Sequence, residues 1–374
     1  MFDNASRRSF LVAPLALQAL PASSSPAPAI KTKVLGKTGL KVTTVGFGTM
    51  ITSDASVIER AADMGITYFD TARGYQSGNC ERMVGAALKS RRKQLVLSTK
   101  SNKEDKESAL QELETSLKEL QTDYVDIWYI HAKSKAEQIT EGRLEAQRIA
   151  KQKGMIRFSG VSTHAGFEEV IPAAIKSGVI DVILSSYNFT MGATIDPLLA
   201  DAKKAGLGIV AMKVMAGGFR RVKPGDPNYS KFKREGVFPA MLRWSMRNPS
   251  IDTTIPSITD HDQLDENFAC MDKGFSPGDA TLLAGQYDFI APLYCRACGK
   301  CSGVCPKGLP IPDMMRYVMY AEGYGQFAMA REQFQMLPAE VREVSCKDCA
   351  TCAVRCPNHV NVMARLSRAQ ELLA

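Results

Sequence analysis

The sequence contains no long hydrophobic run. Its only strongly apolar stretch, residues 10–20, is too short to cross a bilayer as a helix and is interrupted by Pro14. The chain also lacks a run of lysine and arginine, and it lacks a basic stripe interleaved with aromatic residues. We therefore expect neither an integral membrane segment in the mature protein nor a nucleic-acid partner.

A second absence concerns a cofactor-binding motif. No G-x-G-x-x-G sequence opens the chain, which disfavours a doubly wound dinucleotide-binding sheet. The composition is ordinary, because 45% of the 374 residues are hydrophobic and 23% are charged. Such a chain is typical of a globular protein with one large domain and one smaller domain.

Cysteine, by contrast, is concentrated near the C-terminus. Eight of the ten cysteines lie in "CRACGKCSGVCP" (residues 295–306) and "CKDCATCAVRCP" (residues 346–357). Both segments read C-x2-C-x2-C-x3-C-P, the spacing with which three cysteines hold one iron–sulfur cluster while the fourth binds a second cluster. Zinc knuckles and disulfides are the alternatives, but neither requires three close cysteines and a fourth before proline, twice over.

This spacing predicts two [4Fe-4S] clusters. The predicted ligands of one cluster are Cys295, Cys298, Cys301 and Cys356, and those of the other are Cys346, Cys349, Cys352 and Cys305. The remaining two, Cys80 and Cys270, are assigned no chemistry, because a lone cysteine is most often a small buried hydrophobe.

The first 29 residues have the pattern of an export signal. Arg7 and Arg8 precede the apolar stretch, and Ala27, Pro28 and Ala29 form a small-x-small cleavage pattern after it. The paired arginines resemble a Tat signal, whose route carries folded proteins and suits a protein that receives its clusters in the cytoplasm. We expect cleavage after Ala29 and a periplasmic or otherwise exported protein; a general secretory or mitochondrial leader is the alternative.

Between residue 31 and about residue 273, short β-branched segments alternate with amphipathic helical segments. The strand-like segments are "TTVGFG", "TYFDTA", "LVLSTK", "YVDIWYIH", "IRFSGVS", "VIDVILSSYN", "GIVAMKV" and "TTIPSI". These eight β/α units fit an α/β fold of the (β/α)8 TIM-barrel type, whose usual length is about 250 residues. We therefore predict a signal at 1–29, a barrel at 30–276 and a small cluster domain at 277–374.

Polar side chains stand at the predicted ends of three neighbouring strands. Asp70 ends "YFD", Lys100 ends "LSTK" and His131 ends "WYIH", with Tyr75 on the loop after Asp70. Asp70 and Lys100 are 30 residues apart and Lys100 and His131 are 31 apart, so each lies one β/α unit further on at the same level of a barrel. We expect the four side chains to converge on one rim, although each alone could be a helix cap, an ion-pair partner or a satisfied rim residue.

The segments "FDTARGY", "STK" and "YIH" resemble the catalytic tetrad of aldo-keto reductases. The likeness runs from residue 31 to the mid-270s and includes "GMIRFSGVSTH" and "IPSITDHDQLDEN". The last hundred residues are similar to the ferredoxin-type extension of a bacterial branch of that family, with the helical spacer "PDMMRYVMYAEGYGQFAMAREQF" of an α-helical ferredoxin. The resemblance implies nicotinamide-dependent reduction of a small aldehyde or ketone, or the reverse reaction.

The resemblance also assigns a role to each residue of the tetrad. Tyr75 would deliver the proton, although a phenol with an ordinary pKa of about 10 is a poor donor at neutral pH. We expect the Lys100 ammonium to lower the pKa of Tyr75, and Asp70 to hold Lys100 in place and charged. His131 would hydrogen-bond to the substrate carbonyl and orient it.

The residues that the resemblance assigns to the cofactor are only partly of the expected types. They are Ser162, Thr163 and Leu184 at the carboxamide, Met212 at the stacking aromatic, and Glu266 and Asn267 at the adenine. Apart from the resemblance, Arg220 and Arg221 after "MAGG" could contact the phosphates, with a solvated basic turn as the alternative. Ser257 and Gln263 stand where a lysine and an arginine would hold the 2′-phosphate of NADPH. Because two charge-assisted bonds are lost, a strong preference for NADPH over NADH is not expected.

Two functions remain open at this point. The first is an exported aldo-keto reductase-like oxidoreductase whose clusters carry electrons or stabilise the chain. A nicotinamide transfers two electrons as hydride whereas each cluster transfers one, and no flavin signature is present to convert between them. The second is an exported iron–sulfur electron-transfer protein that serves a redox partner and whose barrel has become a docking module.

Overall fold

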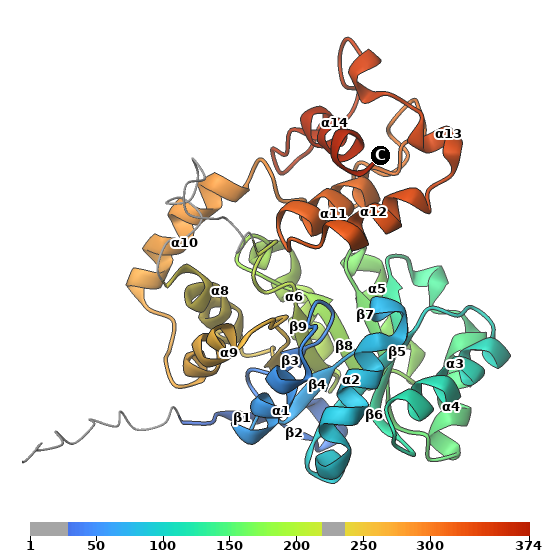
Figure 1. Ribbon diagram of the computed structural model, residues 1–374, viewed down its shortest axis with the longest axis vertical. Coiled ribbons are helices and arrows are strands. Elements are labelled where there is room, and N and C mark those ends of the chain that lie inside the picture. The colour runs from blue at the N-terminus through green and yellow to red at the C-terminus, as the bar shows by residue number, and fades with distance from the viewer. Residues whose placement is uncertain (1–28, 219–235) are drawn as a thin grey trace, which may run out of the picture.

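The computed structural model describes residues 29–218 and 236–374. Its largest part is a barrel of parallel strands that follow one another in sequence order (Figure 1). The strands are β3 (Phe47–Gly48), β4 (Tyr68–Asp70), β5 (Val96–Ser101), β6 (Val125–Lys133), β7 (Ile156–Thr163), β8 (Val182–Ser186), β9 (Gly208–Met212) and β10 (Thr253–Thr254). Bridges from Val45 to Thr254 and from Gly48 to Ser257 join the first and last strands. The predicted (β/α)8 fold is confirmed. Residues 1–28 of the predicted signal, with Arg220 and Arg221, lie outside the described residues.

A layer of helices surrounds the strands. It contains α1 (Ala55–Asp63), α2 (Asn79–Leu88), α3 (Lys106–Glu119), α4 (Glu141–Gln152), α5 (Phe167–Ser177), α6 (Gly192–Lys204), α8 (Val237–Met246) and α9 (His261–Phe268). Side-chain oxygens of Asp54, Asp105, Thr140 and Asp260 accept hydrogen bonds from the first N–H groups of α1, α3, α4 and α9. These caps fix where each of the four helices begins.

Short 3-10 turns complete the connections. They are η1 (Gly36–Thr38), η2 (Tyr75–Gly78), η3 (Lys89–Gln94), η4 (Ala136–Gln138), η5 (Ala269–Met271) and, in the C-terminal part, η6 (Cys346–Asp348).

The barrel has an inner and an outer apolar core. Tyr68, Tyr129, Leu184 and Val210 fill the interior, while apolar residues of the helices pack against the outer face of the strands. Strands β5, β8 and β9 are buried along their whole length, as parallel strands covered on both faces must be. The antiparallel hairpin of β1 (Thr32–Val34) and β2 (Lys41–Thr43) adds Val42 to the interior core and so closes one end of the barrel.

The C-terminal part begins with a helix that packs on the barrel. This helix, α10 (Pro277–Ile290), contacts α8, and Arg243 of α8 forms an ion pair with Asp279 at 2.5 Å. Leu283 of α10 belongs to the barrel core, whereas Ile290 belongs to the core of the following domain. Helix α10 therefore connects the two cores.

The remaining helices form a separate small domain. They are α11 (Ile311–Glu322), α12 (Phe327–Gln335), α13 (Ala339–Arg342) and α14 (Val362–Leu373). Helices α11, α12 and α14 pack on one another around Met314, Phe334 and Leu366. The helical spacer that the sequence predicted between the cysteine motifs is divided into α11 and α12, because Gly325 adopts a left-handed φ of 65° between them.

This small domain lies over one end of the barrel (Figure 1). Asn188, just after β8, donates a hydrogen bond to Tyr294 at 3.1 Å. At the end of α11, a Cβ added to Gly323 would lie only 2.1 Å from the carbonyl oxygen of Gly217, so the two segments approach as closely as a glycine allows. The end covered is therefore the one at which the parallel strands finish. In the described residues, no helix combines the length and the apolar character needed to span a membrane.

Candidate active site and cluster sites

Strand register brings Asp70 and Lys100 together. Asp70 pairs with Ser98 of β5, and Lys100 lies two residues further along the same face of that strand. The Nζ of Lys100 lies 2.5 Å from Oδ2 of Asp70 and 2.6 Å from the carbonyl oxygen of Thr71. Burial raises the pKa of Asp70 and lowers that of Lys100. The attraction between the two charges shifts each pKa in the opposite direction, but burial is the larger effect.

Tyr75 reaches the same place from the turn η2. The turn is tight, since Gln76 and Ser77 adopt left-handed φ angles of 48° and 52°, and the Gln76 side chain donates a hydrogen bond to the carbonyl of Thr52 at 2.8 Å. The Tyr75 hydroxyl lies 3.4 Å from the Nζ of Lys100. The ring of His131 on β6 meets the Tyr75 ring edge-on, with centroids 5.9 Å apart. The structure thus brings the four predicted residues together.

The expected net lowering of the pKa of the Tyr75 phenol is wrong for this structure. Burial raises the pKa of Tyr75 well above its usual value, and the charge of Asp70 adds to the effect. The ammonium is already engaged by Asp70 and by the Thr71 carbonyl, which explains why it does not dominate the phenol. Tyr75 is consequently a protonated phenol at neutral pH.

His131 is neutral at the same pH. Burial lowers its pKa to about 3, and the nearby cations Lys100, Lys133 and Arg316 act in the same direction. A neutral imidazole carries one N–H donor, so His131 is able to donate a hydrogen bond to an oxygen placed beside Tyr75.

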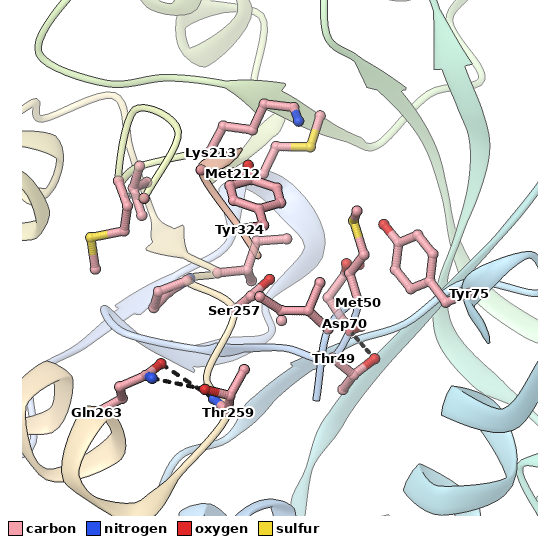
Figure 2. A pocket seen from close by; sticks show the side chains of 18 of the residues that line it. Thr49, Met50, Asp70, Tyr75, Met212, Lys213, Ser257, Thr259, Gln263 and Tyr324 are labelled. Carbon is pink, nitrogen blue, oxygen red and sulfur yellow. Dashed lines mark hydrogen bonds between the residues drawn. The ribbon is translucent and has the colours of Figure 1, made fainter. Parts of the chain in front are cut away.

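A cavity of about 350 Å³, here called the inner cavity, opens beside the tetrad. Figure 2 shows Met212, Lys213 and Tyr324 around one part of it, with Tyr75 facing the same space and Ser257, Thr259 and Gln263 at the other end. Tyr324 follows α11 and therefore belongs to the C-terminal domain. The inner cavity is thus built by both halves of the chain.

The structure distributes the predicted cofactor residues unevenly. Met212 lines the inner cavity. Ser162 and Thr163 are fully buried and hydrogen-bond within the protein. The Ser162 hydroxyl accepts from the backbone N–H of Ala132 at 2.8 Å, and the Thr163 hydroxyl donates to the carbonyl of Ala165 at 2.6 Å. Neither they nor Glu266 and Asn267 of α9 are among the lining residues of the inner cavity.

Asn267 nevertheless has an unusual environment. It is fully buried, and neither its amide nitrogen nor its amide oxygen has a hydrogen-bond partner in the described structure. A buried amide without partners is costly and is often explained by a group that the structure lacks.

The far end of the inner cavity carries an acid that the sequence reasoning did not identify. Asp260 lines it and accepts hydrogen bonds from the backbone N–H and side chain of Gln263, at 2.8 and 2.5 Å. Gln263 also donates to Thr259 at 2.7 Å. Instead of two cations, this end therefore presents a carboxylate.

A second cavity of about 800 Å³, here called the outer cavity, lies between the barrel and the C-terminal domain. Tyr75, His131 and His164 line it from the barrel, and Arg316 and Tyr320 line it from α11. Tyr75 and His164 border both cavities, so the tetrad lies at their junction. The contribution of α11 could not be predicted from the sequence, because the residues of a helix in one domain do not show which part of another domain the helix contacts.

The cysteines form two groups that cross between the motifs. Cys298, Cys301 and Cys356 lie close enough to Cys295 to raise the pKa of its thiol, which burial brings to about 11. In the same way Cys349, Cys352 and Cys305 surround Cys346. No disulfide joins any of the eight thiols. Within the described residues, no set of His, Cys, Asp or Glu side chains has the arrangement needed to hold one metal ion.

The surroundings of the first group suit an anionic iron–sulfur cluster. Arg296 is buried, and its Nε and Nη2 have no hydrogen-bond partner in the described structure. Its Nη1 donates to the carbonyl of Asn358, and the Asn358 side chain donates to the sulfur of Cys298 at 3.6 Å. Thiolate ligands with a guanidinium and an amide donor beside them are the usual environment of such a cluster.

Comparison with known proteins gives two family matches. A model described as the aldo/keto reductase family matches residues 44–238, and one described as a 4Fe-4S dicluster domain matches residues 294–361.

An L-galactose dehydrogenase of Arabidopsis thaliana is 27% identical to this chain, and the match covers 65% of this chain and 88% of that protein. A probable voltage-gated potassium channel subunit beta of the same plant is 25% identical over 64% and 90%. The holo form of an aldo-keto reductase from Bacillus halodurans has a TM-score of 0.61 at 24% identity, covers 73% of this chain and 99% of that chain, and so shows the shared fold.

Proposed function

Because the chain belongs to the aldo/keto reductase family and carries a 4Fe-4S dicluster domain, we propose that it reduces an aldehyde or ketone, or catalyses the reverse oxidation, with Tyr75 as the proton donor. The observation that carries this proposal is the position of the Lys100 ammonium. It lies 2.5 Å from Asp70 and 3.4 Å from the Tyr75 hydroxyl, at the junction of two cavities.

Three side chains of the tetrad act in turn at the carbonyl oxygen of the substrate. The neutral His131 donates a hydrogen bond to this oxygen and orients it towards the phenol. Tyr75, protonated at neutral pH, transfers its proton as negative charge develops on the oxygen. Lys100 then stabilises the tyrosinate, while Asp70 keeps the ammonium charged and in position. A bound nicotinamide would supply the hydride to the carbonyl carbon.

We infer that the nicotinamide cofactor is NADH rather than NADPH. Met212 lines the inner cavity and would contact the ring. At the phosphate end, Asp260 would repel a 2′-phosphate and could accept a hydrogen bond from a ribose hydroxyl. Gln263, already bonded to Asp260 and Thr259, brings no positive charge to this end.

The C-terminal cysteines are proposed to hold two [4Fe-4S] clusters, one on Cys295, Cys298, Cys301 and Cys356 and one on Cys346, Cys349, Cys352 and Cys305. Two such clusters, when bound, store two single electrons, which is the number that one hydride carries. A hydrogen-bonded connection supports exchange with the barrel, because Tyr294 precedes Cys295 and bonds to Asn188, which also donates to the carbonyl of Lys213 at 3.1 Å. Lys213 lines the inner cavity.

Reduction of 4-nitrobenzaldehyde by NADH, catalysed by the holoprotein, tests the reductase proposal. Tyr75→Phe is expected to lower kcat by about 10²- to 10⁴-fold without weakening NADH binding, because only the proton donor is lost. Tyr124→Phe, which removes a hydroxyl from a tyrosine stacked on Arg92 away from both cavities, is the matched control. Equal rates for Tyr75→Phe and the parent would exclude the proposed role.

The second candidate is an iron–sulfur electron-transfer protein whose barrel docks a redox partner. Two observations favour it: Ser162 and Thr163 are engaged by the protein rather than lining the inner cavity, and one relative is named as a channel subunit rather than an enzyme. Titration of the holoprotein with NADH separates the candidates. The reductase predicts quenching of protein fluorescence and, if the halves are coupled, bleaching of the visible cluster absorbance. A docking module predicts neither change.

A further inference from the structure

Lys213 is a basic residue for which the described part of the chain supplies no anionic partner. It follows β9 and lines the inner cavity beside Met212 (Figure 2). Its Nζ lies 5.2 Å from the ring centroid of Tyr320 and 5.6 Å from that of Tyr324, both from the C-terminal domain. Within the described part of the chain, no carboxylate lies within ion-pair distance of this ammonium. The aromatic faces stabilise the charge only in part.

Arg316 supplies a second cation from the other domain. It stands on α11 and lines the outer cavity together with Tyr75 and His131. Its ion pair with Asp313, 2.8 Å long, joins residues one turn apart on the same helix and is partly exposed to solvent. A guanidinium has five N–H donors, so this pair leaves donors free to face the cavity.

Arg316 lines the outer cavity and Lys213 lines the inner one. They approach each other at Tyr320, which lies one turn after Arg316 on α11, lines the outer cavity, and has its ring centroid 5.2 Å from the Nζ of Lys213. Arg316 contributes to the lowering of the Lys213 pKa to about 7, after burial as the main cause. Both cations also lower the pKa of His164, which borders both cavities. Lys213 and Arg316 therefore both lie near the uncharged imidazole of His164.

Few negative groups offset this charge. Asp70 is paired with Lys100, and Asp260 lies at the far end of the inner cavity. The acids lining the outer cavity are Asp313, paired with Arg316, and the exposed Glu332. Keeping an unpaired ammonium at a half-buried position costs folding free energy, which a protein recovers when an anion binds there.

We propose that Lys213 and Arg316 form a subsite for an anionic group of the substrate, so that the substrate is an aldehyde or ketone bearing a carboxylate or a phosphate. The inference rests on the proposed reductase function, and it makes the C-terminal domain part of the substrate site. Arg316 binds two oxygens of the anion through its planar fork, and Lys213 adds a point charge from the barrel side. The carbonyl of the same molecule then meets Tyr75 and His131 at the junction of the cavities.

Matched pairs of substrates test the subsite with the holoprotein. The ratio of kcat/KM for 4-carboxybenzaldehyde to that for benzaldehyde measures carboxylate recognition, and the ratio for glyceraldehyde 3-phosphate to glyceraldehyde measures phosphate recognition. At least one ratio is expected to exceed about ten in the parent. Arg316→Gln and Lys213→Met should each lower that ratio roughly tenfold, mainly by raising KM for the charged substrate. Arg148→Gln, which removes an exposed arginine from α4, should leave the ratio unchanged.

A binding measurement separates failure of the subsite from failure of the reductase function. Calorimetric titration with benzoate and with benzamide requires no turnover, and the parent is expected to bind benzoate more tightly. If no aldehyde is reduced but benzoate is preferred, and the preference disappears in Arg316→Gln, the subsite stands and the reductase proposal fails. Equal binding of benzoate and benzamide by the parent, or ratios near one for both substrate pairs, overturns the subsite, even where a variant does not fold.

Discussion

The side-chain amide of Asn188 donates a hydrogen bond to the hydroxyl of Tyr294, 106 positions further along the chain. Asn188 follows a barrel strand, and Tyr294 directly precedes the first cysteine motif. The same amide donates to the carbonyl of Lys213, and all three groups lie at the covered end of the barrel. One buried amide therefore connects the barrel rim, the inner cavity and the segment that enters the cluster domain.

Close packing between the domains predicts that Gly323 tolerates no side chain. In Gly323→Ala the new Cβ would lie 2.1 Å from the Gly217 carbonyl oxygen and 2.7 Å from that of Met319. We expect a loss of about 1–3 kcal/mol of stability and reduced carbonyl turnover, because the domain must move away from the tetrad. Thermal unfolding and steady-state kinetics measure both. Gly278→Ala on α10, whose Cβ would meet nothing closer than 3.6 Å, is the control; equal effects of the two changes would contradict the prediction.

The buried ion pair predicts non-additive stabilities at Asp70 and Lys100. Removing either partner, in Asp70→Asn or Lys100→Met, leaves the other group buried without its counter-charge and should cost about 3–5 kcal/mol. The double variant should be more stable than the sum of the single effects implies, while remaining inactive. Urea unfolding of the four proteins gives the coupling energy. Strict additivity would show that the two groups do not interact in solution.

Acid should destabilise the protein partly through His131. Its folded pKa of about 3 lies below the unfolded value of about 6.5, so the unfolded chain binds the extra proton between these values. The stability from the neutral imidazole is complete above pH 6.5 and is lost as the pH falls towards 3. Between pH 8 and 5, the melting temperature of the parent should therefore fall further than that of His131→Asn. Parallel curves for the two proteins would contradict the assigned protonation state.

Cofactor preference should be reversible at the far end of the inner cavity. Asp260→Ser with Gln263→Arg removes the carboxylate, keeps a side-chain oxygen able to cap α9 and adds a guanidinium. We expect the affinity for NADPH to rise about tenfold or more, since one charge-assisted bond is worth about 1.5–3 kcal/mol. Fluorescence titration with NADH and NADPH measures the change. If the parent already prefers NADPH, the proposed role of Asp260 is wrong.

Export is proposed to depend on Arg7 and Arg8. Replacing both with lysine keeps the charge but removes the paired arginines of a Tat signal, so the precursor should accumulate in the cytoplasm with its clusters assembled. Cell fractionation with visible absorbance of each fraction measures this. Lys31→Arg, a conservative change beyond the expected cleavage point after Ala29, serves as control. Undiminished export of the double variant would point to a general secretory or other leader.

Local sequence patterns were sufficient for the repeating parts of this protein. The eight strand-like segments were recognisable because parallel strands buried on both faces need continuous apolar, β-branched runs. Asp70, Lys100 and His131 could be placed on one rim because consecutive β/α units have nearly equal lengths. The cysteine spacing likewise predicted which thiols would lie together, since each motif must wrap around a compact group.

Only the tertiary structure decided how these parts act on one another. The pKa of Tyr75 depends first on burial, and Tyr320 and Tyr324 of the C-terminal domain also raise it, which nothing near Tyr75 in the chain encodes. Arg316 of α11 lines a cavity together with Tyr75 and His131 of the barrel only because one domain covers the end of the other. The sequence by itself determined the elements and their chemistry, which are local; desolvation and charge add up over all neighbours in space, and those neighbours exist only once the chain has folded.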